Sequence, residues 1–364
     1  MEQQLLDSLR VVALPTKTNF RGVTVREVAL FKGEQGWAEF SPFVEYEDQE
    51  CAPWLACAIE AATVAKPHLY RTHVAVNGTI PALNDEADLE RVVNSFPGVK
   101  TFKVKVGTDV SDDLHRLDVI RTLRPNAAIR IDVNGLWNVE EAEMFLNSVG
   151  EIEYVEQPCA TIAELRELKQ RVDVKIVGDE VLRKSTNPFD VDLTGAVDYL
   201  MLKVQPLGGI KKAHALAEHH NLPVVVSSAL ESAVGINYGL LLAASFEEMR
   251  FDCGLGTGSL LAKNVAELPI IDGKIEISDV KPVLDALGTE LLESGHSFEK
   301  IANYFPRSVK DYDALRASLG LKERGILDEQ LEAYAKSKKT SVSKLTDEER
   351  SKVIDLALRG YKQT

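Results

Sequence analysis

The sequence has few residues of the kinds that build disulfide frameworks or zinc sites. Its 364 residues include four cysteines, which have no CxxC spacing and no matching histidine pairs: Cys51, Cys57, Cys159 and Cys253. Disulfide scaffolds and zinc sites both need regular spacings of this kind. The sequence therefore indicates neither, and Cys159, just after a predicted strand, is interpreted as a small filler residue rather than a nucleophile.

The chain also lacks a basic excess, a long apolar run and a glycine-rich nucleotide loop. Its 42 Lys and Arg stand against 56 Asp and Glu, a formal charge of -14. Nucleic-acid surfaces are usually basic and membrane spans need about 20 apolar residues. The N-terminus, MEQQLLDSLRVV, has no signal-peptide layout, and no GxGxxG follows the first strand of the repeat described below. We expect a cytoplasmic metabolic protein without nucleic-acid or membrane partners, whose oligomeric state stays open.

The first part of the chain alternates apolar and polar residues. The runs VVALPTKTNF, GVTVREVALFKG and GWAEFSPF have the period of half-buried strands, and DQECAPWLACAIEAATVA has helical spacing. We predict that residues 1–72 form an α+β capping domain of an antiparallel meander and a helix. A later alternating stretch, PIIDGKIEI, could rejoin the meander, so residues from about 263–300 are expected to complete this domain.

Residues 73–262 repeat a different pattern, in which short apolar runs alternate with segments of helical spacing. Eight such runs and seven intervening segments fit a barrel better than an open doubly wound sheet. The predicted fold class is α/β, a (β/α)-barrel of the modified TIM type with an α+β N-terminal capping domain. Residues 306–364 are predicted to be a helical C-terminal appendage, either a partner-binding helix or, the interpretation we favour, a solvated helix on the outside of the barrel.

Charged residues stand at the ends of five successive predicted strands. A parallel strand is buried on both faces, and a buried charge costs several kcal/mol unless it is paired or binds a metal. In a closed barrel these strand ends meet at one mouth. The charged residues concerned are Lys103, Lys105, Asp132, Glu156, Asp179, Glu180 and Lys203, and the polar Asn134 follows Asp132.

Three of the acidic residues recur at the period of one βα unit. Glu156 follows Asp132 by 24 residues and Asp179 follows Glu156 by 23, so all three should project at one height from neighbouring strands. An all-oxygen ligand set favours Mg2+, although each acid alone could equally be a helix N-cap. Asn134 and Glu180, each beside a candidate ligand, are expected to point the other way and to support or cap rather than bind the metal.

The lysines are expected to flank the metal. Lys103 and Lys105 are two residues apart, so both should point into the barrel, while Lys203 should approach from the opposite side. A lysine near another cation and partly desolvated has a lowered pKa, as a general base needs near neutral pH. Lys103 would depress the pKa of Lys105 in this way, or would simply be an ion-pair partner of a neighbouring carboxylate.

In the order Lys-Val-Lys, Asp-Val-Asn, Glu-Gln-Pro, Gly-Asp-Glu and a later Lys, the sequence resembles the muconate-lactonizing branch of the enolase superfamily. Within that branch GVTVREVALFKGEQGWAEFSPFVEY, DVNGLW and VVVSSALESAVGI are most similar to the o-succinylbenzoate synthases of the actinobacterial type. The likeness covers about residues 18–290. It implies that Asp132, Glu156 and Asp179 hold Mg2+, that Lys105 removes the substrate's α-proton, and that Lys203 stabilises the enediolate as a cation, with Lys103 tuning Lys105.

The reaction implied by the resemblance is a syn-dehydration of 2-succinyl-6-hydroxy-2,4-cyclohexadiene-1-carboxylate to 2-succinylbenzoate, in menaquinone biosynthesis. Racemases of N-acylamino acids, dipeptide epimerases and muconate cycloisomerases share the same site, and a non-catalytic barrel is the alternative of a different class. The expected substrate contacts, each with a packing or surface role as its alternative, are Ser227, Ser228, Gly254, Gly256 and Arg21, the last in a loop over the mouth.

Overall fold

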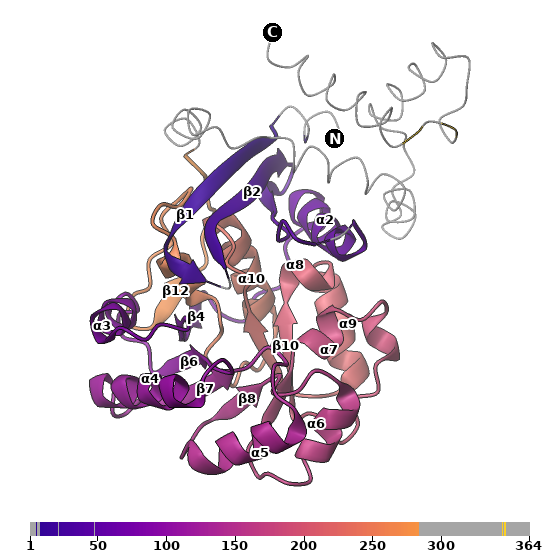
Figure 1. Ribbon diagram of the computed structural model, residues 1–364. Helices are drawn as coiled ribbons and strands as arrows, with labels where there is room; N and C mark the ends of the chain where they lie inside the picture. Colours follow the sequence, from indigo (N-terminus) through magenta and orange to yellow (C-terminus); the bar gives the residue numbers. More distant parts are fainter. Residues whose placement is uncertain are drawn as a thin grey trace.

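The computed structural model describes residue 5, residues 8–20, 22–46 and 48–283, and residues 344 and 346. In these residues a small antiparallel part stands on the mouth of a curled parallel sheet that is surrounded by helices (Figure 1). The predicted appendage at 306–364 lies outside the described residues, apart from those two positions. So does the end of the segment that was expected to complete the capping domain.

The capping domain is the predicted meander with its helix. The strands β1 (Arg10–Phe20), β2 (Val23–Gly33) and β3 (Gly36–Phe40) pair antiparallel in that order. Helix α2 (Asp48–Thr63) packs against β3 and β2. Buried aromatic side chains from the sheet and from Trp54 of α2 form a core separate from that of the barrel. The alternating pattern correctly indicated strands, but the middle of β2 is buried on both faces: Val28 and Leu30 lie in the main core, and Ala29 and Phe31 lie in this second core.

The second part is a parallel sheet whose strands follow one another in chain order. Its seven strands in the described residues are β5 (Gly78–Ile80), β6 (Thr101–Lys105), β7 (Ala128–Asp132), β8 (Tyr154–Glu156), β9 (Ile176–Gly178), β10 (Tyr199–Lys203) and β11 (Val224–Ser227). Every pairing between neighbours is parallel. The carboxyl ends of all seven strands therefore lie on the same side of the sheet, as the barrel prediction requires.

Helical segments connect these strands. They are α3 (Glu86–Asn94), α4 (Val110–Leu123), α5 (Val139–Ser148), α6 (Ile162–Leu168), α7 (Glu180–Arg183) with the 3-10 turn η1 (Pro188–Asp190), α8 (Val204–Leu207), α9 (Ile210–His220) and α10 (Ala233–Ser245). Local sequence fixes where several of them begin. Asn138 with Glu141 forms a capping box at α5, and Thr161 with Glu164 forms one at α6.

The barrel closes through single bridges rather than through a full eighth strand. Cys253 forms a parallel bridge with Val76, and the next residue, Gly254, forms one with Ser227 at the end of β11. The chain then turns into the 3-10 segment η2 (Gly256–Leu260). The run FDCGLGTG thus stands where an eighth strand was predicted, but its three glycines and early turn leave it little strand character.

The segment expected to rejoin the meander forms a strand that pairs elsewhere. The strand β12 (Lys274–Glu276) pairs antiparallel with β4 (His73–Ala75), the short strand that precedes β5. It therefore extends the first element of the barrel region, not the three-stranded sheet of the capping domain. The alternating sequence correctly indicated a strand, but alternation does not specify which edge the strand joins.

Two buried carboxylates of the capping domain bind the first turns of barrel helices. Glu39 of β3 accepts hydrogen bonds from Ser232 Oγ at 2.5 Å and from the Gly235 amide at 2.9 Å, at the start of α10. Glu60 of α2 accepts from the Ile210 amide of α9 at 2.5 Å. Carboxylates are stabilising at helix N-termini, where free amides carry partial positive charge. These contacts fix the capping domain on the barrel.

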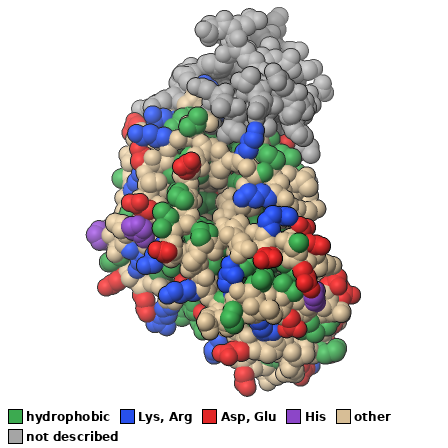
Figure 2. Space-filling model, turned by 90° about the vertical axis from the view of Figure 1, so that its left-hand side faces the viewer, with side chains coloured by type: hydrophobic (Ala, Val, Ile, Leu, Met, Phe, Trp, Pro, Cys, Tyr) green, Lys and Arg blue, Asp and Glu red, His purple; other side chains and the backbone are tan. Residues whose placement is uncertain are grey.

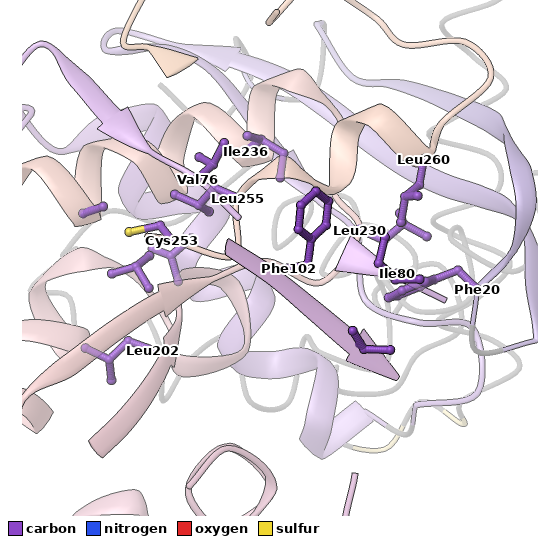
Figure 3. Packing of buried hydrophobic residues seen from close by; sticks show 14 of the residues in the cluster. Phe20, Val76, Ile80, Phe102, Leu202, Leu230, Ile236, Cys253, Leu255 and Leu260 are labelled. Atoms are coloured by element: carbon purple, nitrogen blue, oxygen red, sulfur yellow. The ribbon is translucent and has the colours of Figure 1, made fainter. Parts of the chain in front are cut away.

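The main hydrophobic core joins both parts. Figure 3 shows Phe20 of β1 beside Ile80 of β5, with Phe102 and Leu230 in the same cluster. On the face in Figure 2, acidic, basic and hydrophobic side chains of the described residues are interspersed. Among those residues no helix combines the length and apolarity needed to cross a membrane.

Candidate active site

A cleft opens at the carboxyl ends of the barrel strands, beneath the capping domain. The barrel contributes charged and small polar side chains to it, and the capping domain contributes aromatic ones. Its lining residues are Phe20, Phe43, Tyr46, Trp54, Thr79, Lys103, Lys105, Asp132, Asn134, Arg183, Lys203, Pro206, Ser227, Ser228, Ala229 and Thr257. Most of the residues expected at the mouth therefore meet in one place.

Strand β6 carries Lys103 and Lys105 on its inner face, as their two-residue spacing predicts. Lys105 is register partner to Asp132, which is in turn partner to Glu156, so these three lie at one height on adjacent strands. Lys105 Nζ lies 2.6 Å from Asp132 Oδ2. Lys103 Nζ lies 2.6 Å from Glu156 Oε2 and 3.2 Å from Asp132 Oδ2. Both lysines are thus ion-paired in this structure.

Lys203, at the end of β10, reaches the same group of carboxylates from the other side. Its Nζ lies 2.5 Å from Asp179 Oδ2 and 3.7 Å from Glu156 Oε1. Arg183, one helical turn after Asp179, binds the same carboxylate, with its Nε 3.1 Å from Asp179 Oδ2. The carboxylates therefore lie between Lys105 on one side and Lys203 on the other, which is the arrangement predicted from the strand order.

Burial and charge set the protonation of the pair on β6. Burial lowers the pKa of Lys105, Asp132 raises it and Lys103 lowers it again, with a net lowering. Burial would also lower the pKa of Lys103, but Glu156 and Asp132 outweigh burial and raise it. Lys103 therefore remains a cation, while Lys105 loses its proton more readily than an ordinary lysine.

The carboxylates differ among themselves. Burial would raise the pKa of Asp132, but Lys105 and Lys103 hold it below its usual value. Lys203 and Arg183 likewise overcome burial to lower the pKa of Asp179. Burial and the nearby Asp132 raise the pKa of Glu156. Neighbouring cations thus hold Asp132 and Asp179 as anions. Glu156 is the acid whose ionised form would gain most from a further cation.

The donor set fits a hard divalent cation. Two buried oxygens, Asp132 Oδ1 and Glu156 Oε1, accept no hydrogen bond from the described residues. An unsatisfied buried carboxylate oxygen is costly, and a bound cation would satisfy both. In the described part of the chain, no group of three or more Asp, Glu, His or Cys side chains is arranged closely enough to hold a metal ion as it stands. The ammonium groups of Lys103 and Lys203 lie between the acids, so an ion would have to replace those contacts.

Asn134 differs from its expectation. Its backbone has φ 56° just beyond the end of β7, and the side chain faces the cleft rather than away from it. Asn134 Oδ1 accepts from Lys105 Nζ at 2.7 Å, and Nδ2 donates to Glu180 Oε1 at 3.0 Å. The expectation misapplied strand alternation: Asn134 stands two residues after Asp132, and residues two apart face the same side, as Lys103 and Lys105 do. Glu180 begins α7 and also pairs with Arg183 at 2.6 Å, which agrees with a supporting role.

Two comparisons place the chain among known proteins. A family model described as enolase N-terminal domain-like matches residues 11–62, and one described as enolase C-terminal domain-like matches residues 86–284. The o-succinylbenzoate synthase of Mycobacterium leprae is 46% identical over 297 residues, 79% of this chain and 88% of that protein. The o-succinylbenzoate synthase of Mycobacterium tuberculosis is 47% identical over 296 residues, 79% and 90% of the two chains. The chain belongs to the o-succinylbenzoate synthase family of the enolase superfamily.

Solved structures of two other enzymes share its fold at low identity. The L-Ala-D/L-Glu epimerase from Bacillus subtilis matches with TM-score 0.63 and 22% identity, covering 76% of this chain and 96% of that one. The N-succinyl Arg/Lys racemase from Bacillus cereus matches with TM-score 0.65 and 20% identity, covering 78% and 98%. These likenesses confirm the capped barrel. Members of the superfamily typically use a divalent metal.

Of the small residues predicted to contact substrate, the two serines line the cleft and the two glycines pack behind them. Ser227 and Ser228 line the cleft, and Ser228 Oγ donates to the Gly254 carbonyl at 2.5 Å. A methyl group on Gly254 would collide with Ser227 Oγ, and one on Gly256 would meet the Asn77 carbonyl oxygen at 2.7 Å. The glycines thus allow close packing behind the serines, and direct substrate contact by any of the four stays a prediction. Arg21 lies outside the described residues.

The sequence analysis missed Gln157 and Arg183, which hold the metal-ligand candidates in place. Gln157 is fully buried, and its Oε1 accepts from the backbone amides of Asp179 at 3.0 Å and Val181 at 3.2 Å. Arg183 joins Asp179 to Tyr46 of the capping domain, whose Oη lies 3.2 Å away. The Glu-Gln-Pro sequence could have pointed to Gln157, since a buried glutamine at a strand end requires partners. No comparable signal marked Arg183.

Proposed function

We propose that this chain dehydrates 2-succinyl-6-hydroxy-2,4-cyclohexadiene-1-carboxylate to 2-succinylbenzoate, as an o-succinylbenzoate synthase of menaquinone biosynthesis. The observation that carries the proposal is the 46–47% identity to mycobacterial o-succinylbenzoate synthases over 88–90% of their length. The protein is a lyase that releases water from a small carboxylate. The arrangement of lysines in the cleft supports the same reaction.

Lys105 is the base in this proposal. Burial and the neighbouring Lys103 lower its pKa, so Lys105 gives up its proton more readily than an ordinary lysine, and it lines the cleft. It removes the proton from the carbon next to the substrate carboxylate. The bond between the ring and its 6-hydroxyl then breaks, and the same ammonium group returns the proton to the departing hydroxide on that face. Water leaves and the ring becomes aromatic, so atoms and charge balance without an oxidant or reductant.

Lys203 and Lys103 act as fixed cations. Lys203 lies across the carboxylates from Lys105, where an ammonium group would stabilise negative charge that develops on the substrate carboxylate. Lys103 keeps its proton because Glu156 and Asp132 raise its pKa above the usual value. It faces Lys105 as a neighbouring positive charge and favours the neutral form of that base.

Mg2+ is the proposed cofactor, held by Asp132, Glu156 and Asp179. The proposal is supported by the oxygen-only donor set and by the two unsatisfied buried oxygens on Asp132 and Glu156. A bound divalent cation would neutralise part of the second negative charge on the substrate carboxylate, which is several kcal/mol of stabilisation. Gln157 and Arg183 would keep Asp179 oriented toward it.

The deciding experiment compares two activities of the purified protein with Mg2+. We expect conversion of the cyclohexadiene carboxylate to 2-succinylbenzoate, followed by the absorbance of the aromatic product. In deuterium oxide we expect little or no exchange of the α-proton of N-acylamino acids. Lys105→Ala should abolish the dehydration, as a control that activity arises in this cleft. Rapid exchange into both enantiomers of an N-acylamino acid, without dehydration, would replace this proposal with a racemase.

A further inference from the structure

A buried arginine of the capping domain contacts both walls of the cleft. Arg26 on β2 is 2% exposed. Its Nε donates to the Leu230 carbonyl at 3.2 Å, in the segment that leads from β11 to α10. Its Nη1 donates to the Pro42 carbonyl at 3.0 Å, and Nη2 donates to the Ser41 carbonyl. One side chain thus ties a barrel segment to the segment that follows β3.

Both segments that Arg26 joins supply residues that line the cleft. Ser228 and Ala229, just before Leu230, line the cleft from the barrel, and Phe43, just after Pro42, lines it from the capping domain. The separation between these two walls therefore depends on where Arg26 holds the carbonyls. None of the atoms that Arg26 binds is itself a reacting group.

The barrel segment is held in a conformation that needs support. Leu230 has φ 63°, in the left-handed region that costs a residue with a side chain roughly 1–2 kcal/mol. Its side chain is fully buried in the core that also contains Ile80 and Phe20 (Figure 3). The Arg26 contact fixes the outward-facing carbonyl of this strained residue, while core packing fixes its side chain.

The chemistry of the contact requires a guanidinium group. Three nitrogens of one planar group each meet a different carbonyl, which a single ammonium group cannot reproduce. The guanidinium carbon also lies 4.4 Å from the centroid of the Phe43 ring, over its face, and 6.0 Å from that of Trp54. Arg26 therefore orients an aromatic wall of the cleft as well as the backbone beside it.

We propose that Arg26 is a positioning residue for substrate binding, which sets the distance between the Ser228–Ala229 wall and the Phe43 wall. This inference rests on the dehydration proposed above. Arg26 acts through other residues, so its loss should weaken uniform binding of substrate more than it slows the chemical step. The substrate's ring and succinyl chain would then fit a cleft whose walls no longer keep a fixed separation.

The test measures KM and kcat for Arg26→Met and Arg26→Lys against the wild type. Met keeps most of the side-chain length without donors, and we expect it to raise KM roughly tenfold, the effect of losing a buried, charge-assisted hydrogen bond. We expect kcat to change by less than about threefold. Lys keeps the charge and part of the hydrogen bonding, so its KM should be intermediate.

Glu60→Gln is the matched control. Glu60 also joins the capping domain to the barrel, through the Ile210 amide and Tyr238 Oη at 2.8 Å, but it does not line the cleft described above. We expect this variant to lower the melting temperature and to leave both kinetic constants unchanged. An equal rise of KM in Glu60→Gln would overturn the proposal, because any loosening of the capping domain would then have the same effect.

A folded Arg26→Met enzyme with the wild-type KM would also overturn the proposal. If that variant does not fold, Arg26→Lys decides: a raised KM supports the positioning role and an unchanged KM contradicts it. Failure of the proposed function is a separate result, since it would appear as a wild-type protein that does not dehydrate the cyclohexadiene carboxylate.

Discussion

Replacing Lys103 with methionine should move the pH dependence of the reaction to higher pH. Lys103 and Lys105 share one partner atom, Asp132 Oδ2, at 3.2 and 2.6 Å. Their nitrogens therefore lie no farther apart than the sum of these distances, about 5.8 Å, where two unit charges repel by about 3 kcal/mol at an effective dielectric constant of about 20. That repulsion favours the neutral form of Lys105.

The direction follows from the protonation state that the base requires. Lys103 lowers the pKa of Lys105, so removing the Lys103 charge raises that pKa and leaves more of the base protonated at neutral pH. The acid limb of the kcat/KM profile should move upward by about one to two pH units, since about 1.4 kcal/mol corresponds to one unit. At high pH, where the base is neutral in both proteins, the rates should approach each other.

The assay is the initial rate of aromatic product formation across the pH range, at saturating Mg2+. Lys103→Arg is the control, because it preserves a cation beside Lys105 and should keep the profile near that of the wild type. An active Lys103→Met enzyme with an unaltered profile would refute the reasoning. Lys103 would then be only an ion-pair partner of Glu156 and Asp132.

The other predictions concern metal binding, stability and pH. Chelation should abolish activity reversibly, and Asp132→Asn should weaken Mg2+ binding in calorimetry without unfolding; an unchanged affinity would contradict the proposed site. Gln157→Leu should lower the urea-measured free energy of unfolding by roughly 2–4 kcal/mol, because two buried amides lose their acceptor. Burial and Glu39 raise the pKa of Glu231 to about 7, so this group's contribution to stability should fall as pH rises from about 4.5 through about 7. Glu231→Gln should show a smaller fall in urea titrations over that range; an identical slope would contradict the assignment.

The residues that could be predicted from sequence share one property, a repeated spacing. Asp132, Glu156 and Lys105 occur at the ends of buried strands, and parallel strands in a barrel bring such ends together whatever the loops do. Asn134 was expected on the wrong side, although it stands two residues from Asp132 and alternation puts residues two apart on the same side. The eighth strand was predicted but is not formed in full, because single bridges take its place.

The shape of the cleft depends on contacts of another kind. Arg26 binds backbone carbonyls, one of them 204 positions away in the chain, and carbonyls carry no sequence signature by which a partner could be recognised. Lys105 and the carboxylates are, by contrast, placed by strands that any barrel of this type must form. A chain with the same lysines and acids but another residue at position 26 would keep its proton-transfer groups and change the separation of its cleft walls. In the proposed mechanism, proton transfer and substrate fit therefore depend on different residues of this fold, and only the first set could be predicted from spacing.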